Sequence, residues 1–409
     1  MIAAPATLAQ ALDRIAREDH RWHAMLALNP LAAPAAPGPL LGMVLAVKDN
    51  IDVAGLPTSS GCRALAHGAA LADAPVVARL RAAGAVVVGK TNLSEFSFEI
   101  RSKSSLGGDV LCPYAPGTTA GGSSGGSAVA VARGFATAAL GTDTGGSIRI
   151  PASCNGLVGL RPAHGVLPMA GIAPLAPSTD TVGPLTRSVG EARLLYTIMG
   201  GPIGGAVPLR PRVGVLRQAF GQDPRILAAC EGALARLTAA GGEVVDPCTL
   251  PDVEALLEAP HIVDAQFASA FDAYLARRAV TQGGPASLDA LVAGGDFLPD
   301  HRPVLIARME TAPDPAPILA RHRDLTAMLH AMMVQHRVDA LFYPTMRVIP
   351  EGLGNPPGGW APELAARSGW PAITVPAAAP GQRPVGVELL VPARQEATLF
   401  ALSTLLEQR

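Results

Sequence analysis

The amino-acid sequence predicts an α/β fold in which a central β-sheet carries helices on both of its faces. Apolar runs of strand length alternate with helix-like segments along most of the 409 residues, and this alternation is typical of layered α/β proteins. Apolar residues make up 49% of the chain and charged residues only 16%, so the chain can bury a large core. No repeat or low-complexity linker divides the sequence. We therefore predict a single domain over residues 1–409, rather than the two or three domains that its length suggests.

The predicted elements of the amino-terminal part follow from the spacing of apolar residues. Leu8–Leu28 has the amphipathic spacing of a helix, and Leu40–Val47 is a continuous apolar run typical of a buried strand. Asp73–Ala83 is predicted as a helix, with an acidic N-cap and an early proline. Gly84–Gly89 is predicted as a strand of the parallel type, because its small and β-branched residues form one unbroken run.

The rest of the chain contains further strands and helices, with two stretches that we predict to be irregular. Pro168–Thr186 is predicted as a long loop because it is rich in proline, threonine, serine and glycine. Gln282–Pro303 is predicted as a poorly ordered part of an otherwise helical region, Leu250–Arg337. The predicted strands are Gly156–Arg161, Arg212–Leu216, Glu243–Val245, Ala340–Tyr343, Ala372–Val375 and Pro384–Val391, and the predicted helices are Asp223–Ala240 and Ala397–Glu407.

Charge and composition exclude several classes of function. The 32 basic and 33 acidic residues give a net charge of −1, without the basic excess that binding to nucleic acid or to an anionic membrane surface requires. The most apolar stretch, Ala128–Leu140, is interrupted by Arg133 and Gly134 and is shorter than the ~20 residues of a membrane-spanning helix. The amino-terminal residues lack the pattern of a secretory signal, and the 5 cysteines form no CxxC pair. We therefore predict reduced thiols and a cytoplasmic location.

The stretch Gly121–Ser153 contains the most informative pattern in the chain. It holds two glycine-rich turns with serines, separated by a predicted helix at Ser127–Arg133 and a predicted strand at Phe135–Leu140. The second turn, Gly141–Gly146, places Ser147 at the expected N-terminus of another helix. A serine in such a turn can act as a nucleophile, and the unpaired backbone N–H groups beside it can stabilise a developing oxyanion.

Other interpretations of these turns have less support. The turns lack the Gly-Lys-Ser/Thr ending of a phosphate-binding P-loop and the spacing of a dinucleotide-binding fingerprint. Gly122–Gly126 matches the G-x-S-x-G pattern of a histidine-dependent esterase, with Ser124 as its central residue, but no strand precedes it. His20 and His23 have His-x-x-His spacing. Without a third ligand nearby we expect two surface histidines rather than a metal site.

Two lysines follow apolar strands, and either could serve as a catalytic base. Lys48 follows the predicted strand Leu40–Val47, and Lys90 follows Gly84–Gly89. A surface lysine, at the point where a strand meets solvent, is the commoner arrangement. A desolvated lysine, in contrast, has a lowered pKa and can accept a proton. The local sequence does not choose between Lys48 and Lys90.

Taken together, these segments resemble the amidase signature family, the serine hydrolases that use a Ser–cis-Ser–Lys triad. Gly121–Ser153 is similar to the signature block of that family. The resemblance extends, in the same order, to the strand with Lys48-Asp49-Asn50, DAPVVARLRAAGAVVVGKTNLSEF, GLVGLRPAHGVL, DTVGPLTRSV, VDALFYPT, SGWPAITVP and PVGVELLVP. It implies one α/β domain with a central mixed β-sheet. It also implies a signature core at about residues 40–200 and a variable helical region on the substrate side at about residues 250–338.

The resemblance assigns roles to individual residues. Ser147 matches the nucleophile, Ser123 the cis-serine and Lys48 the lysine of the triad, so the resemblance favours Lys48 over Lys90 as the base. The residues that match the oxyanion hole are Thr144, Gly145 and Gly146, together with Ser147. The residues that match supporting positions are Ser124, Asp143 and Arg149. The resemblance implies neither a metal nor another cofactor.

The resemblance implies an amidase that hydrolyses the carboxamide C–N bond of a small molecule through a serine acyl-enzyme. The alternative within the family is the glutaminase (A-type) subunit of a tRNA-dependent amidotransferase. Outside enzymes, the alternative is a binding protein on the same scaffold. The expected partner is a small-molecule amide substrate, with neither nucleic acid nor a membrane, and a homodimer is left open. We expect substrate-facing segments at Glu99–Tyr114, Met169–Ser178 and parts of Leu256–Leu298.

Overall fold

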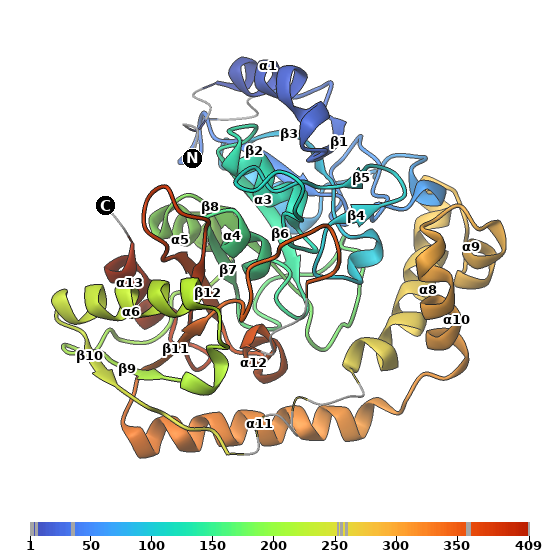
Figure 1. Ribbon diagram of the computed structural model, residues 1–409. Coiled ribbons are helices and arrows are strands. Elements are labelled where there is room, and N and C mark those ends of the chain that lie inside the picture. The colour runs from blue at the N-terminus through green and yellow to red at the C-terminus, as the bar shows by residue number, and fades with distance from the viewer. Residues whose placement is uncertain are drawn as a thin grey trace.

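A mixed β-sheet forms the centre of the computed structural model of this protein (Figure 1). The structure describes residues 4, 7–33, 37–251, 253, 257, 261–356 and 361–407. Within these residues the sheet has 11 strands in the order β1-β3-β2-β6-β8-β7-β12-β13-β11-β9-β10. The strand bounds are β1 Met25–Leu28, β2 Val44–Lys48, β3 Val86–Thr91, β6 Ala138–Asp143, β7 Val158–Arg161, β8 Thr181–Thr186, β9 Arg212–Val215, β10 Glu243–Val245, β11 Ala340–Pro344, β12 Ala372–Pro376 and β13 Gly386–Leu390. Strands β4 Lys103–Ser104 and β5 Gly108–Asp109 pair separately.

Strand direction and register decide which side chains share a face of the sheet. Neighbours are parallel in β3-β2-β6 and β11-β9-β10 and antiparallel elsewhere, so the predicted mixed α/β sheet is confirmed. A register shift within the β2–β3 pair makes Val47 the partner of Lys90 and Lys48 the partner of Thr91. Partners across two strands lie on the same face, and successive residues alternate. Lys48 and Lys90 therefore point to opposite faces of the sheet.

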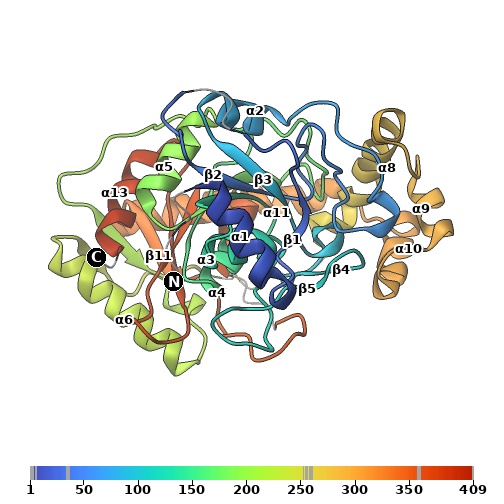
Figure 2. The same ribbon diagram turned by 90° about the horizontal axis from the view of Figure 1, so that it is seen from above.

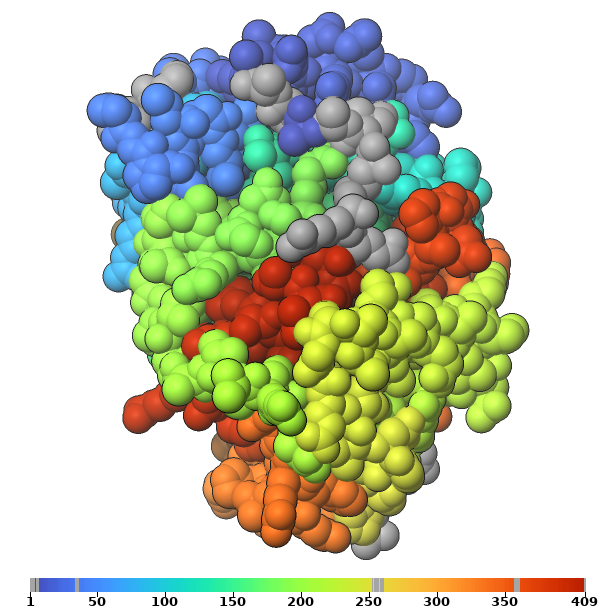
Figure 3. Space-filling view, turned by 90° about the vertical axis from the view of Figure 1, so that its left-hand side faces the viewer, coloured from blue at the N-terminus to red at the C-terminus, as the bar shows by residue number. Residues whose placement is uncertain are grey.

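Helices cover both faces, as the sequence predicts. Helices α2 Pro75–Ala82, α5 Val189–Ile198, α6 Pro224–Ala239 and α13 Glu396–Leu406 form one layer, whose core includes Leu45 and Val47 of β2. Helices α1 Leu8–Glu18, α3 Gly125–Ala132 and α4 Arg149–Cys154 cover the other face, whose core includes Val44 and Ala46. The alternation along β2 is the two-residue period of a strand buried on both sides. Figure 3 shows α13 lying between α5 and α6 on the surface of the first layer.

A group of helices beside the sheet forms a second packing unit. Helices α8 Ile262–Gln282, α9 Leu288–Gly294 and α10 Arg302–Glu310 lie together at one end of the molecule, as the views from the front and from above agree (Figures 1 and 2). Their apolar core is rich in phenylalanine and reaches the main body at Phe96. Helix α11 Pro315–His336 then runs along the underside of the body and contacts α12 Ala361–Ser368. None of the described helices combines the length and the apolar character that crossing a bilayer requires.

The structure corrects four of the predicted elements. The helix predicted at Leu8–Leu28 ends at Glu18, because the chain turns and β1 pairs with β3. The predicted loop Pro168–Thr186 contains β8, an interior strand whose proline and threonine content concealed it. The turn predicted to begin at Gly141 begins only after Asp143, where β6 ends. The stretch predicted as poorly ordered, Gln282–Pro303, contains α9, and helices α5 and α12 lie where we predicted none.

Candidate active site

Lys48, at the end of β2, is completely buried and faces hydroxyl groups rather than a carboxylate. Its Nζ lies 2.7 Å from Ser123 Oγ and 2.8 Å from Thr142 Oγ1, and Asn50 Nδ2 donates to the same threonine oxygen at 3.0 Å. Burial lowers the pKa of Lys48 to about 7, against the opposing influence of nearby carboxylates, chiefly Asp143. The surface lysine that the sequence allows is therefore excluded here. A substantial fraction of this amine is uncharged near neutral pH.

The two serines come from the turns at either end of the α3–β6 unit. The Gly122–Ser123 peptide bond is cis, at the position that the resemblance gives to the cis-serine. Ser123 is completely buried beside Lys48, whereas Ser147 forms part of the wall of a cleft. The two turns are joined through their backbones, because Ser124 N donates to Ser147 O at 3.1 Å. Within the described residues no hydrogen bond joins the hydroxyl of Ser147 to that of Ser123.

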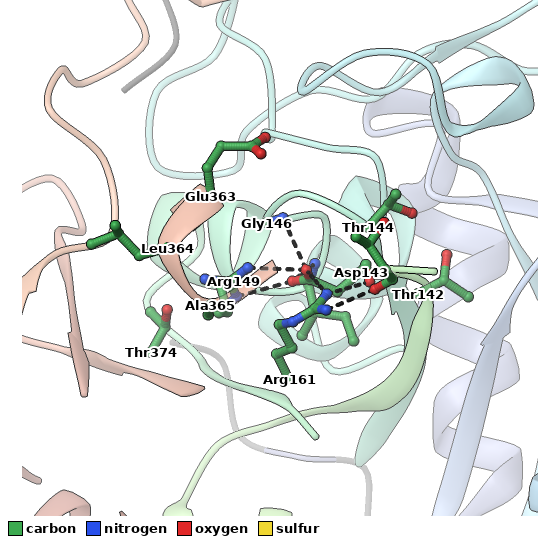
Figure 4. Close-up of polar contacts among 12 residues, drawn as sticks. Thr142, Asp143, Thr144, Gly146, Arg149, Arg161, Glu363, Leu364, Ala365 and Thr374 are labelled. Atoms are coloured by element: carbon green, nitrogen blue, oxygen red, sulfur yellow. Dashed lines mark hydrogen bonds and ion pairs between the residues drawn. The ribbon is translucent and has the colours of Figure 1, made fainter. Parts of the chain in front are cut away.

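Asp143, the last residue of β6, is the centre of a buried ionic network (Figure 4). Its carboxylate accepts hydrogen bonds from Arg149 at 3.1 and 3.0 Å, from Arg161 Nη1 at 2.8 Å, and from the N–H groups of Gly146 and Ile148 at 2.9 and 3.1 Å. Burial alone would raise the pKa of Asp143, but the two guanidinium groups hold it well below its usual range. The network therefore fixes the turn that carries Ser147.

Arg149 extends this network to the far strands of the sheet. Its Nη1 lies 2.5 Å from Glu388 Oε1, which also accepts a hydrogen bond from Tyr343 Oη at 2.9 Å. Burial raises the pKa of Glu388, and the guanidinium of Arg149 opposes that shift. Two carboxylates and two guanidinium groups thus neutralise each other within the buried network, as buried charges require.

Backbone N–H groups beside Ser147 are candidates for binding an anion. Within the described residues, the N–H groups of Thr144, Gly145 and Ser147 have no hydrogen-bond partner. The N–H of Gly146, which the resemblance places in the oxyanion hole, instead donates to Asp143 Oδ1 at 2.9 Å. In this structure, three of the four N–H groups of the turn are therefore open to a ligand.

The cleft beside Ser147 has a volume of about 270 Å³. Each of the three segments predicted to face the substrate contributes to its wall, through Glu99, Leu175 and Asp264, while Leu256 lies outside the described residues. Arg308 of α10 also lines the cleft and lies within the region of about residues 250–338 that we predicted on the substrate side, whereas Glu363 of α12 comes from a segment that we did not predict. The wall therefore joins the signature region to the helices of the variable region.

Glu363 brings a carboxylate from helix α12 up to Gly145 of the turn. A Cβ atom at Gly145 would come within 2.6 Å of Glu363 Oε1, so a larger residue there would displace this carboxylate from its present position. The carboxylate accepts from His261 Nε2 at 3.2 Å and from Arg367 Nε at 3.0 Å. Burial would raise the pKa of Glu363, but His261 and Arg367 lower it to about 2. The same contact with Glu363 raises the pKa of His261.

Comparison with known proteins decides the family. The sequence model of the family described as Amidase matches residues 6–400, nearly the whole chain. The chain belongs to the amidase signature family. This amidase is 34% identical over 386 residues to the indoleacetamide hydrolase of Pseudomonas savastanoi, an alignment that covers 90% of this chain and 84% of that protein. It is also 34% identical over 446 residues to the A-type subunit of glutamyl-tRNA(Gln) amidotransferase from Thermus thermophilus, covering 99% of this chain and 93% of that protein.

Solved structures agree with the sequence relatives. The native peptide amidase from Stenotrophomonas maltophilia superposes with a TM-score of 0.84 at 34% identity, covering 98% of this chain and 92% of that chain. A complex of a peptide amidase with the competitive inhibitor chymostatin gives a TM-score of 0.86 at 34% identity, covering 98% of this chain and 93% of that chain. These relatives establish that this amidase is an amide-hydrolysing enzyme.

The remaining sequence candidates lie outside the cleft of this amidase. Lys90 is buried on the other face of the sheet, where it forms an ion pair with Asp49. Ser124, the centre of the esterase-like pattern, is completely buried and donates to Thr142 O at 3.2 Å. His20 and His23 are exposed, as predicted. Among the described residues, no three His, Cys, Asp or Glu side chains gather into a group that could hold a metal ion.

Several residues of the site were not predicted from the sequence. Thr142 Oγ1 contacts the Lys48 amine and also accepts a hydrogen bond from Asn50 Nδ2. Asp180 accepts a hydrogen bond from Thr144 Oγ1 at 2.6 Å. A usable signal existed for Asn50, which follows Lys48 in the segment that resembles the family. The local sequence did not mark Thr142 as a site residue, because it lies in a part of β6 that we predicted as a turn. It did not mark Asp180 either, because that residue lies in the predicted loop Pro168–Thr186.

Proposed function

We propose that this amidase hydrolyses the carboxamide C–N bond of a small molecule, with Ser147 as nucleophile and Lys48 as base. The observation that supports this most directly is the 2.7 Å contact between Lys48 Nζ and Ser123 Oγ in a buried site that lowers the pKa of Lys48 to about 7. An uncharged amine in contact with a hydroxyl can accept its proton, whereas a serine hydroxyl that keeps its proton is too weak a nucleophile to attack an amide.

In the proposed reaction, Ser147 Oγ attacks the carbonyl carbon of the amide. Its proton passes to Ser123 Oγ while the proton of Ser123 passes to Lys48 Nζ. The Ser147 hydroxyl must first rotate onto Ser123, and catalytic hydrogen bonds are often open before substrate binds. The oxyanion is held by the N–H groups of Thr144, Gly145 and Ser147, each such donor being worth about 3 kcal/mol of barrier.

In the second half of the reaction, the relay of protons from Ser147 through Ser123 to Lys48 runs in reverse. The C–N bond breaks as Ser123 returns a proton to the leaving nitrogen and Lys48 returns one to Ser123. Water then attacks the acyl-enzyme, its proton enters the same relay, and the carboxylic acid leaves with Ser147 restored. Asp143 and Arg149 hold the turn, and Ser124 anchors it through its backbone contact with Ser147.

A hydrolysis screen tests the proposal. Purified protein is assayed against primary amides, anilides, ureas and esters, with Ser147→Ala as the matched control. We expect release of amine or ammonia from at least one amide class, and loss of that activity in Ser147→Ala. Full activity in Ser147→Ala would rule out the proposed nucleophile.

The second candidate is the glutaminase subunit of a tRNA-dependent amidotransferase. It is favoured by the Thermus thermophilus relative, whose alignment covers 99% of this chain. It predicts hydrolysis of glutamine and copurification with partner subunits. A small-molecule amidase predicts neither glutamine hydrolysis nor copurifying partner subunits. The sequence leaves open whether this amidase forms a homodimer, and analytical sedimentation measures its oligomeric state.

A further inference from the structure

A second cavity of this amidase lies along helix α11, separate from the cleft at Ser147. Its volume is about 950 Å³. One wall is a face of α11, which runs beneath α12 in Figure 1, and the other includes the end of α12. We call this cavity the α11 groove, and its basic lining residues are His164, His322, Arg323, His330 and Arg367.

The charge of the α11 groove is one-sided. No aspartate or glutamate belongs to its lining in the part of the chain that the structure describes. Arg323 is exposed, and within the described residues it has no ion pair. The lining also contains the apolar side chains of Leu319, Ala327 and Trp370. A groove of this kind complements an anion that carries an apolar body.

His322 is an unsatisfied polar group in the wall of the groove. Its side chain is only 6% exposed, and its Nε2 has no hydrogen-bond partner. Burial, with the nearby charge of Arg367, lowers the pKa of His322 to about 4, so the imidazole is uncharged at neutral pH. A buried nitrogen without a partner is costly, and rotation of the imidazole toward the groove would let its N–H donate to an oxygen atom of a ligand.

One ion pair connects the α11 groove to the cleft. Arg367 belongs to the groove lining, and its Nε donates to Glu363 Oε2 at 3.0 Å. The other carboxylate oxygen of Glu363 lies against Gly145, two residues from Ser147. An anion held by Arg323 would attract the Arg367 guanidinium, which lines the same groove, and so weaken its pairing with the carboxylate that packs against the turn.

We propose that the α11 groove binds a small monocarboxylate with an apolar body, and that binding there slows hydrolysis. A monoanion suits the groove because Arg367 is already paired with Glu363, which leaves Arg323 as its unpaired guanidinium among the described residues. Amide hydrolysis converts a neutral amide into such a carboxylate. The inhibitor would thus be of the same class as the product, a part of the proposal that rests on the proposed function.

Binding is tested first, in a form that does not depend on hydrolysis. Phenylacetate is titrated by calorimetry into the full-length Ser147→Ala variant, with 2-phenylethanol as an uncharged probe. Adding Arg323→Gln should weaken phenylacetate binding about two- to fivefold, the range for losing one exposed charged contact. The matched control Arg321→Gln removes the same charge from the same helix outside the groove lining and should leave the affinity unchanged.

Inhibition is tested second, with the amide substrate found in the screen. Phenylacetate should lower kcat with little change in KM, and Arg323→Gln should raise the inhibition constant by the same factor as the dissociation constant. The proposal is overturned if phenylacetate raises KM alone, since it would then occupy the cleft. It is equally overturned if Arg321→Gln weakens binding as much as Arg323→Gln, or if inorganic phosphate binds as tightly as phenylacetate.

Discussion

Lys48 and Lys90 stand at the ends of neighbouring strands, both fully buried, yet their surroundings differ in kind. Lys90 Nζ lies 2.9 Å from Asp49 Oδ1 and donates to Pro57 O at 2.7 Å, so its charge is matched by a carboxylate. Lys48 Nζ contacts the hydroxyls of Ser123 and Thr142 and, among the residues that the structure describes, no carboxylate. A buried ammonium with a carboxylate partner is a structural element, whereas one surrounded by hydroxyls gives up its proton more easily.

The register of the β2–β3 pair places the two lysines on opposite faces of the sheet and so gives them different surroundings. The shift within the β2–β3 pair sets Lys48 opposite Thr91, whose hydroxyl lies 2.7 Å from Ser127 Oγ of α3. Lys48 therefore faces the layer that carries the serine turns. Lys90 faces the opposite layer with Val47. A one-residue change of register exchanges the faces of every side chain on a strand, so two similar lysines can have unrelated roles.

The largest expected effect is the loss of activity in Lys48→Met. Without an amine to take the proton of Ser123, kcat/KM should fall by about a thousandfold or more, near the upper part of the range for losing a general base. Steady-state kinetics measure the fall, and circular dichroism checks that the variant is folded. Activity within tenfold of the wild type would remove Lys48 from the proposed mechanism.

Lys90→Met should instead reduce stability. The substitution leaves Asp49 buried with 2% exposure and without its cation, and breaking a buried pair in this way costs about 3–5 kcal/mol. Urea unfolding measures the loss, while kcat per folded molecule should stay within a few fold of the wild type. Adding Asp49→Asn should restore part of the stability. A Lys90→Met variant that is as stable as the wild type but inactive would reverse the assignment of the two lysines.

The pH dependence of activity should report Lys48. Its pKa is lowered to about 7, and only the uncharged amine can act as a base. Below this value kcat/KM should fall tenfold per pH unit, to about a hundredth of its plateau at pH 5. In Lys90→Met, kcat/KM should fall below pH 7 in the same way. A profile that is flat from pH 5 to 8 would contradict the assignment.

The smallest effect concerns the stability cost of burying Lys48. The pKa of Lys48 is lowered from 10.5 to about 7 in the folded state, so the unfolded chain binds the extra proton between these values. The cost is therefore complete below pH 7 and disappears as pH rises toward 10.5. Lys48→Met should raise the free energy of unfolding at pH 6 by roughly 1–4 kcal/mol. Urea titrations at pH 6 and pH 9 should show the gain shrinking with pH; a gain that grows would refute the sign.

Strands and helices with clear apolar periodicity could be predicted from the sequence, and those with mixed composition could not. β2 and β3 are runs of valine, alanine and leucine, and the structure places strands there. β8 was predicted as loop, because Thr181–Thr186 contains Gly183 and Pro184, although it pairs with β6 and β7 inside the sheet. The composition of a short strand says little when neighbours on both sides supply its partners.

The candidate site divides in the same way. Ser147 in a turn before a helix, and a lysine at the end of a buried strand, were visible in the sequence. Glu363 and Arg308 were not, because they come from helices far along the chain that approach Ser147 only in the folded protein. The N–H of Gly146 also could not be assigned beforehand, since its bond to Asp143 depends on how the turn closes.

By itself, the sequence determined the alternating α/β order, the serine-bearing turns and two lysines at the ends of apolar strands, where burial could desolvate them. These features depend on local spacing and composition, which do not change with the tertiary contacts of the chain. The tertiary structure alone decided which lysine meets a hydroxyl and which meets a carboxylate. It also decided which distant helices close the cleft. The physical reason is that strand register and helix packing set the electrostatic surroundings of a buried group, and neither is encoded within reach of that group along the chain.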